Sequence, residues 1–245
     1  MTYKEIITTR YDDLTSMCGL ERMGSPLRVF EIGLKEPSID LLRELTEDFT
    51  YIGIDPSSDA VDAAMELYPE NTFILGDLCD CRRPFQYVSR HPFDLIIMSD
   101  IREKLIHLSY SILSPMGVLY IKASDDGMML CYPDTELLEN ISSLYRQFSD
   151  SDPLCGRKIY NWLMDTGFKD VKHRIAYRTS VETSFRERMG IYESFAKSRL
   201  LDKMPANARA LMQEYLEELK GEFVLDNFYF VMPKLYFAAS NQSEM

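Results

Sequence analysis

Val29-Phe30-Glu31-Ile32-Gly33 is followed by Tyr51-Ile52-Gly53-Ile54-Asp55 and then by Phe73-Ile74-Leu75-Gly76-Asp77. Each stretch is a short apolar run that ends in glycine or a carboxylate, which is typical of buried parallel strands. The carboxyl ends of such strands meet at one edge of a sheet and form a ligand crevice there. We therefore expect the three stretches to build one binding site.

The hydrophobic periodicity extends this pattern along the chain. It predicts strands near 28–33, 50–54, 72–76, 93–98 and 117–122, and helices near 37–48, 57–68 and 101–113. Strands and helices that alternate on this scale indicate a doubly wound parallel sheet.

After residue 122 the pattern of expected strands and helices is less regular. Helices are expected from Pro133-Asp134 to about Phe148 and over 156–165, where Gly167 ends the second one. Strands are expected over 171–177 and 226–239, with a bulge or an edge position at Pro233. A long helical region over 183–220 lies between these two strands.

Composition restricts the class of protein. The chain has 245 residues, 46% of them hydrophobic, and a formal net charge of −12, which disfavours nucleic acid as a partner. The charged start, Met1-Thr2-Tyr3-Lys4-Glu5, is not typical of a signal peptide, and no apolar run approaches the roughly 20 residues that span a bilayer. Five scattered cysteines suit a reducing compartment. We expect a cytoplasmic protein that does not enter the membrane.

The motifs, in their order, resemble those of class I S-adenosylmethionine-dependent methyltransferases over about residues 25–180. Glu31-Ile32-Gly33 is similar to the start of the family's glycine motif, Asp55 to the acidic end of strand two, and Gly76-Asp77-Leu78 to the third-strand motif. The segment Leu113 to Ile121 is similar to the family's turn into strand five, and the segment Asn161 to Val171 resembles its entry to strand six.

This resemblance implies a fold and a domain arrangement. The fold is a Rossmann-like, doubly wound, seven-stranded, mostly parallel sheet with an antiparallel C-terminal strand and extra covering helices. The expected parts are an N-terminal helical cap (1–24), a cofactor-binding core (25–182), a helical insertion or lid (183–225) and a C-terminal strand that completes the core sheet (226–245). The helical parts either cover the acceptor, pack on the sheet or form a homodimer face.

The resemblance also implies S-adenosylmethionine as cofactor and a set of residues around it. Asp55 would accept from the ribose hydroxyls, Asp77 from the adenine amino group, and Glu31 would order the amino end of the cofactor. The implied cofactor-binding residues are Glu31, Gly33, Lys35, Asp55, Pro56, Asp77, Leu78 and Ser99.

Each of these residues also has an ordinary structural interpretation. Gly33 can simply make a tight turn, and Asp55 can cap the helix at Ala60. Asp77 can be a solvated turn residue, and Glu31 can satisfy loop amides. Ser99, like its neighbour Asp100, either lines the floor beneath the reacting methyl group or caps the next helix.

One departure from the family motif concerns the first loop. Lys35 and Pro37 stand where glycines are usual, and non-glycine residues do not freely adopt positive φ. The loop must therefore follow a different path or carry strain of order 1–3 kcal/mol. Lys35 either pairs with the methionine carboxylate of the cofactor or is an ordinary exposed lysine.

The acceptor side is marked by carboxylates after strands four and five. The candidate substrate-binding residues are Asp100, Asp125 and Asp126, the last two of which can also cap a loop. Displacement from a sulfonium requires positioning more than a general base, so the sequence assigns no catalytic residue. Cys79 and Cys81 have no second pair nearby, and we assign no metal.

Three functions fit these observations. The first is methyl transfer from S-adenosylmethionine to a small organic acceptor. The second is a non-catalytic binding or regulatory module with the same fold, suggested by Lys35 and Pro37. The third is an NAD-dependent oxidoreductase, although the chain lacks Gly-x-Gly-x-x-Gly.

Overall fold

The computed structural model describes most of the chain. The described residues are 14–20, 23, 25–80, 92–132, 136–148, 152–181, 200–225 and 227–241. They divide into two compact units. One unit holds residues 2–123, 158–174 and 235–245, and the other holds 124–157 and 175–234, so the chain passes repeatedly from one to the other.

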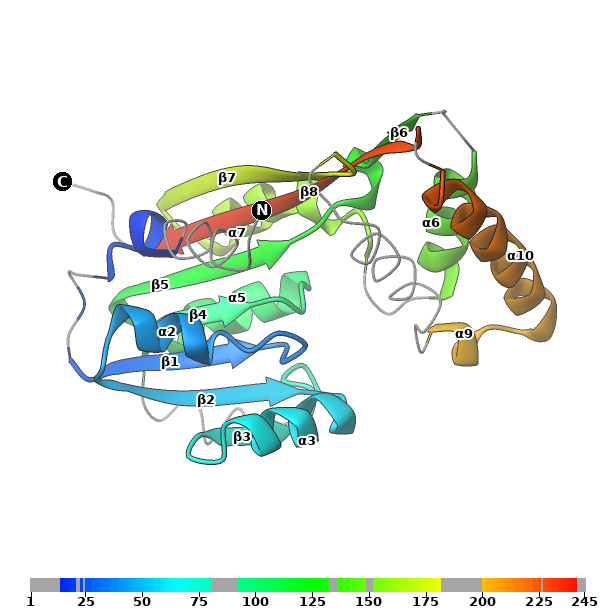
Figure 1. Cartoon of the computed structure of the whole chain (residues 1–245). Helices are drawn as coiled ribbons and strands as arrows, with labels where there is room; N and C mark the ends of the chain where they lie inside the picture. The colour runs from blue at the N-terminus through cyan, green and yellow to red at the C-terminus, as the bar shows by residue number, and fades with distance from the viewer. Residues whose placement is uncertain are drawn as a thin grey trace. The chain divides into compact units, whose positions relative to one another are not determined.

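The strands confirm the predicted class of a mostly parallel α/β sheet. β1, β2, β3, β4 and β5 pair in parallel in the order β3-β2-β1-β4-β5, and β8 pairs antiparallel with β5 (Figure 1). The strands are β1 (Leu27–Ile32), β2 (Phe49–Asp55), β3 (Thr72–Leu75), β4 (Phe93–Met98), β5 (Leu113–Ala123), β6 (Leu130–Tyr132), β7 (Asp170–Thr179) and β8 (Tyr229–Ser240).

Within the described residues the sheet has eight strands, one more than predicted. The additional strand is β6, which pairs antiparallel with the first residues of β8. Pro233 is not on an edge strand, because β8 pairs with β5, β6 and β7. It lies between the residues that pair with β6 and those that pair with β5, where the missing N–H removes no bond of either ladder.

The helices lie close to their predicted positions, with shorter ends. α2 begins after Ser38, and α7 ends at Gly167, whose φ of 109° makes it a left-handed C-cap as expected. The helices are α2 (Ile39–Leu45), α3 (Ser58–Leu67), α5 (Glu103–Ile112), α6 (Leu137–Phe148), α7 (Ile159–Thr166), α9 (Leu200–Lys203) and α10 (Ala206–Phe223), with short 3-10 turns at Asp126–Met128 and Cys155–Lys158.

The first unit has a core on each face of its strands. On one face, α2, α3 and the helical residues 14–18 pack over alternate strand residues such as Val29 and Ile97. The intervening residues Phe30 and Ile96 are equally buried and therefore face the other side. There α5 and α7 pack against each other. The strand ends are thus held from both faces.

The second unit has a core of its own. α6 and α10 pack together and enclose apolar side chains that also come from β8. Phe223, Phe228 and Phe230 form an aromatic cluster with ring centroids 5.3–6.4 Å apart. Of the region 183–220, only residues from 200 onward are described, so the predicted helix over 183–199 lies outside the described residues. No helix of the described chain is both long and apolar enough to cross a membrane.

Candidate ligand crevice at the carboxyl ends of the strands

The carboxyl ends of β1 to β4 come together at one edge of the first unit. The turns after β1, β3 and β4 are each bonded to the end of a neighbouring strand. Gly33 N–H donates to the Ile54 carbonyl over 2.9 Å, and Gly76 N–H donates to the Asp55 carbonyl over 3.0 Å. The sequence motifs around Gly33, Asp55, Asp77 and Asp100 therefore share this edge.

Gly33 makes the turn that leaves β1. Its φ is 92°, a conformation that favours glycine. A Cβ on Gly33 would lie 2.5 Å from Ser99 Oγ and 2.9 Å from the Asp100 nitrogen. Ser99 Oγ in turn donates to the Gly33 carbonyl over 3.0 Å. The absence of a side chain thus lets the β1 and β4 turns touch, in addition to making the tight turn.

The loop that follows Gly33 takes its own path without backbone strain. Among the described residues, no non-glycine residue has positive φ, so neither Lys35 nor Pro37 is strained. Leu34 is buried and packs over Gly53, where a Cβ would lie 2.6 Å from the leucine Cδ2 atom. Lys35 is exposed on the loop. Of the two predictions for this loop, the strained backbone is not observed.

Asp55 organises the turns on both sides of it. Its Oδ2 accepts from Leu34 N–H and its Oδ1 from Ser57 N–H, each over 2.7 Å. The cap of α3 is Ser57, whose hydroxyl accepts from Ala60 N–H over 3.4 Å. A carboxylate has about four acceptor positions, so two on Asp55 are available to a ligand. Pro56 beside it is exposed.

Glu31 lies fully buried beneath the loop after β1. Its Oε2 accepts from Ser38 N–H and the Tyr51 hydroxyl, each over 2.8 Å, and its Oε1 accepts from Ser38 Oγ and Lys122 Nζ over 2.9 and 3.0 Å. Burial, together with the Glu31 carboxylate, raises the pKa of Tyr51, so the phenol remains a donor. These four bonds use the acceptor positions of Glu31 and fix the loop.

Asp77 and Asp100 are joined by Arg102, which sequence reasoning did not assign to the site. Arg102 Nη1 and Nη2 donate to the Asp77 carboxylate over 2.6 and 3.0 Å, and Nη2 also donates to Asp100 over 2.6 Å. The only signal in the sequence was an arginine two residues after Asp100, close to several acidic strand ends. Ser99 beside them is exposed, and Leu78 is buried.

The electrostatics of this edge follow from these contacts. The hydrogen bond from Arg102 holds the pKa of Asp77 below its usual range. Burial raises the pKa of Asp100, as do the charges of Asp77 and Asp55, while Arg102 opposes them. The Arg102 guanidinium thus lies between two carboxylates, and Asp55 adds a third negative charge to this edge. This excess of negative charge and of hydrogen-bond acceptors favours a ligand that carries positive charge and many hydrogen-bond donors.

Asp125 belongs to the second unit and is fully buried there. It accepts from Arg157 through the backbone N–H, Nε and Nη2, over 2.9, 2.9 and 2.6 Å, and from Gly127 N–H over 3.0 Å. Burial raises the pKa of Asp125, but the bonds from Arg157 outweigh it and lower the pKa overall. Asp125 therefore holds a loop, and the side chain of Asp126 lies outside the described part of the chain.

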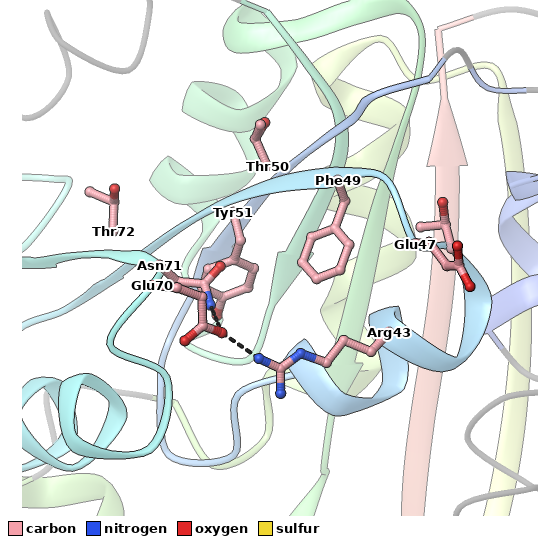
Figure 2. Close-up of a pocket in the computed structure, with 9 residues that line it drawn as sticks. Arg43, Glu47, Phe49, Thr50, Tyr51, Glu70, Asn71 and Thr72 are labelled. Carbon is pink, nitrogen blue, oxygen red and sulfur yellow. Dashed lines mark hydrogen bonds and ion pairs between the residues drawn. The ribbon is translucent and has the colours of Figure 1, made fainter.

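A hollow of about 620 Å³ lies at the other end of the strands. It is lined by the first residues of β2 and β3 and by Arg43 of α2, which Figure 2 shows reaching toward Glu70. None of the predicted site residues lines it. The residue chemistry and the strand ends therefore place the candidate site at the carboxyl edge.

Comparison with known proteins supports the fold. No family model matches the chain, and no curated protein matches it in sequence. Solved structures are similar to the chain in fold, and they include a cyclopropane synthase and two methyltransferases. The cyclopropane synthase MmaA2 from Mycobacterium tuberculosis is 14% identical with a TM-score of 0.56, over 96% of this chain and 86% of that one.

The other two similar structures were solved with a ligand. A methyltransferase from Geobacter sulfurreducens, in complex with S-adenosyl-L-homocysteine, is 16% identical with a TM-score of 0.52 over 99% of this chain and 92% of that one. Phosphoethanolamine N-methyltransferase 2 from Haemonchus contortus, in complex with S-adenosyl-L-methionine, is 18% identical with a TM-score of 0.56. The match covers 96% of this chain but 53% of that enzyme, so this chain spans about half its length.

These similarities and the strand order define the class of fold. The chain has the fold of the class I S-adenosylmethionine-dependent methyltransferases. The crevice lies at the edge where the fold places its ligand.

Proposed function

We propose that the crevice binds S-adenosylmethionine and that the protein transfers its methyl group to a small organic acceptor. The observation that carries this proposal is the meeting of Gly33, Asp55 and Asp77 at one edge, with acceptor positions left on both carboxylates. When bound, S-adenosylmethionine supplies a methyl group on a sulfonium, which is already activated for displacement. The cationic sulfonium suits an edge that carries three carboxylates and one guanidinium.

Each crevice residue has a defined task in this proposal. The two remaining acceptor positions of Asp55 receive the ribose hydroxyls, and the remaining position of Asp77 receives the adenine amino group beside Leu78. Lys35, exposed on the loop, reaches the carboxylate of the ligand. Ser99 and Asp100 line the floor where the acceptor meets the methyl group. Positioning supplies the rate enhancement, so no general base is assigned.

The acceptor, the location and the assembly state are part of the same proposal. A net charge of −12 opposes nucleic acid, and we propose a small molecule as the acceptor. Cys18, Cys79, Cys131 and Cys155 form no disulfide in the described chain, which suits the reducing cytoplasm. A homodimer remains a proposal, and sedimentation of the purified protein would test it.

The second candidate is a binding module with this fold that does not transfer methyl groups. It is supported by the hydrogen bonds that the protein itself makes to the crevice carboxylates. Arg102 bonds Asp77, and loop amides bond Asp55. Such a module would bind S-adenosylmethionine or S-adenosylhomocysteine without turnover. An NAD-dependent oxidoreductase is the third candidate and would prefer NAD.

Calorimetric titration with S-adenosylmethionine, S-adenosylhomocysteine and NAD tests the ligand. We expect micromolar binding of the first two and none of NAD. Asp55→Ala should weaken binding by about 1–3 kcal/mol, because it removes a hydrogen-bond acceptor from the site. The control is Asp94→Ala, since Asp94 also accepts from a backbone N–H, that of Arg28 over 3.1 Å, but at the start of β4.

The outcomes separate the three candidates. Equal affinity for S-adenosylmethionine in wild type and Asp55→Ala would remove Asp55 from the site. Binding without methyl transfer to any of a broad panel of small acceptors would favour the non-catalytic module. Preference for NAD would favour the oxidoreductase. A folded protein that binds none of the three ligands would overturn the proposed function.

A further inference from the structure

Arg102 occupies a position in the crevice that no sequence motif assigned. It follows β4 and stands at the N-cap of α5, with an extended backbone at φ −141° and ψ 140°. Its guanidinium spans the ends of β3 and β4, because it bonds Asp77 with both terminal nitrogens and Asp100 with one. The side chains of Arg102, Asp77 and Asp100 are 26%, 23% and 24% exposed, so a ligand in the crevice can reach all three.

The acceptor capacity of Asp77 is nearly used by the protein. Its carboxylate accepts from Cys79 N–H over 2.7 Å and from both terminal nitrogens of Arg102. This leaves about one of some four acceptor positions. Two parallel bonds between arginine and a carboxylate are also the strongest kind of side-chain pair. A ligand amino group must therefore share the Asp77 carboxylate with Arg102.

The arrangement has a cost as well as a benefit for stability. A bidentate arginine–carboxylate pair is among the partly exposed ion pairs that do stabilise a fold. Arg102 Nε is buried and has no hydrogen-bond partner among the described residues, which costs free energy. The bonds of Arg102 to two crevice carboxylates therefore come with the desolvation of one unpaired donor, Nε.

We propose that Arg102 is a specificity-determining residue of the crevice, which controls the access of the ligand's base to Asp77. In the ligand-free protein it holds Asp77 and Asp100 together across the base end of the site. An exocyclic amino group on the ligand's base finds one acceptor position on Asp77 and gains a second only by displacing a bond from Arg102. The inference rests on the proposed function, because it takes an adenine-containing ligand as the occupant.

The test compares two nucleosides that differ by one group. Purine riboside is adenosine without the amino group, so their affinity ratio reports whether Asp77 accepts from that group. We expect a small ratio in wild type and a ratio about tenfold larger in Arg102→Met, which frees Asp77. Arg102→Lys keeps the charge but loses the fork, and it should give an intermediate ratio.

The matched control is Arg43→Met. Arg43 also bridges two carboxylates, Asp40 and Glu70, but it does so beside the hollow at the amino ends of the strands (Figure 2). Its loss should leave the nucleoside ratio unchanged. Thermal unfolding of each variant shows that it is folded. Arg102→Lys, which also loses the bidentate bond to Asp77, replaces Arg102→Met if that variant fails to fold.

The possible results distinguish this inference from the proposed function. A larger ratio in Arg102→Met supports the inference, even if no methyl transfer is found. Binding of S-adenosylhomocysteine by wild type with an unchanged ratio in the Arg102 variants overturns the inference and leaves the proposed function standing. Folded wild type and variants that all fail to bind adenosine, purine riboside and S-adenosylhomocysteine overturn both.

Discussion

Two features of the turn after β1 require glycine at position 33. Its φ of 92° disfavours any side chain, and a Cβ would collide with the Asp100 nitrogen. We expect Gly33→Ala to lower the free energy of unfolding by about 1–3 kcal/mol, measured by urea denaturation. Gly221→Ala is the control, because nothing lies within 4 Å of the position that a Cβ would take there, inside α10. That change should stabilise the protein by about 0.5–1 kcal/mol, and equal effects of the two would contradict this account.

Asp125 links the stability of the second unit to pH. Its pKa is lowered in the folded protein, so its contribution is present above the unfolded pKa of about 3.9 and disappears as pH falls through the lower folded value. Asp125→Asn should cost about 1.5–3 kcal/mol at pH 7, because the bonds to Arg157 lose their charge. Denaturation at pH 7 and near pH 3 should show the difference from wild type shrinking, and a difference independent of pH would exclude this role.

At the scale of elements, α10 illustrates how one helix face supports the second unit. Leu219 is 1% exposed and lies in the core that α10 shares with α6 and β8, whereas Leu211 on the same helix is 38% exposed. We expect Leu219→Ala to destabilise the protein by about 2–5 kcal/mol, the usual cost of a buried cavity. Leu211→Ala should cost less than about 1 kcal/mol. Similar unfolding midpoints for the two variants would show that this face does not support the core.

The crevice is formed by several elements together, because it is made of turns that follow four different strands. The turns after β1, β3 and β4 are anchored by a side chain or a backbone group of another strand, as when Asp55 of β2 binds the amide of Leu34 after β1. A change in one turn therefore reaches its neighbours. This coupling is why the controls for the ligand experiments lie at the opposite ends of the strands.

For the whole molecule, a ligand should protect a defined subset of the backbone. Hydrogen exchange with saturating S-adenosylhomocysteine should slow at residues 33–38, 55–57, 77–79 and 99–102, because binding stabilises the turns of the crevice. Residues 43–50, beside the hollow of Figure 2, should be unaffected. Mass spectrometry of peptic peptides measures both regions. Protection confined to residues 43–50 would move the site to the other end of the strands.

Much of the first unit was predictable from local pattern. The strand expected at 93–98 is observed at Phe93–Met98, and the other four strands differ mainly at their ends. Parallel strands are buried on both faces, so each is a continuous apolar run that can be read without its neighbours. The end of α7 at Gly167 was also predictable, because a glycine in the left-handed conformation ends a helix through local geometry. The strand β6 was missed because three residues carry too little periodicity.

The sequence by itself determined the class of fold and the edge at which Gly33, Asp55 and Asp77 meet, because both follow from local runs and their order. Only the tertiary structure decided what those carboxylates bind. Lys122 reaches Glu31 from 91 residues away, and Arg102 reaches Asp77 across 25. Which donor a carboxylate finds depends on distances between strand ends, and these are set by the packing of the whole sheet rather than by the residues beside it.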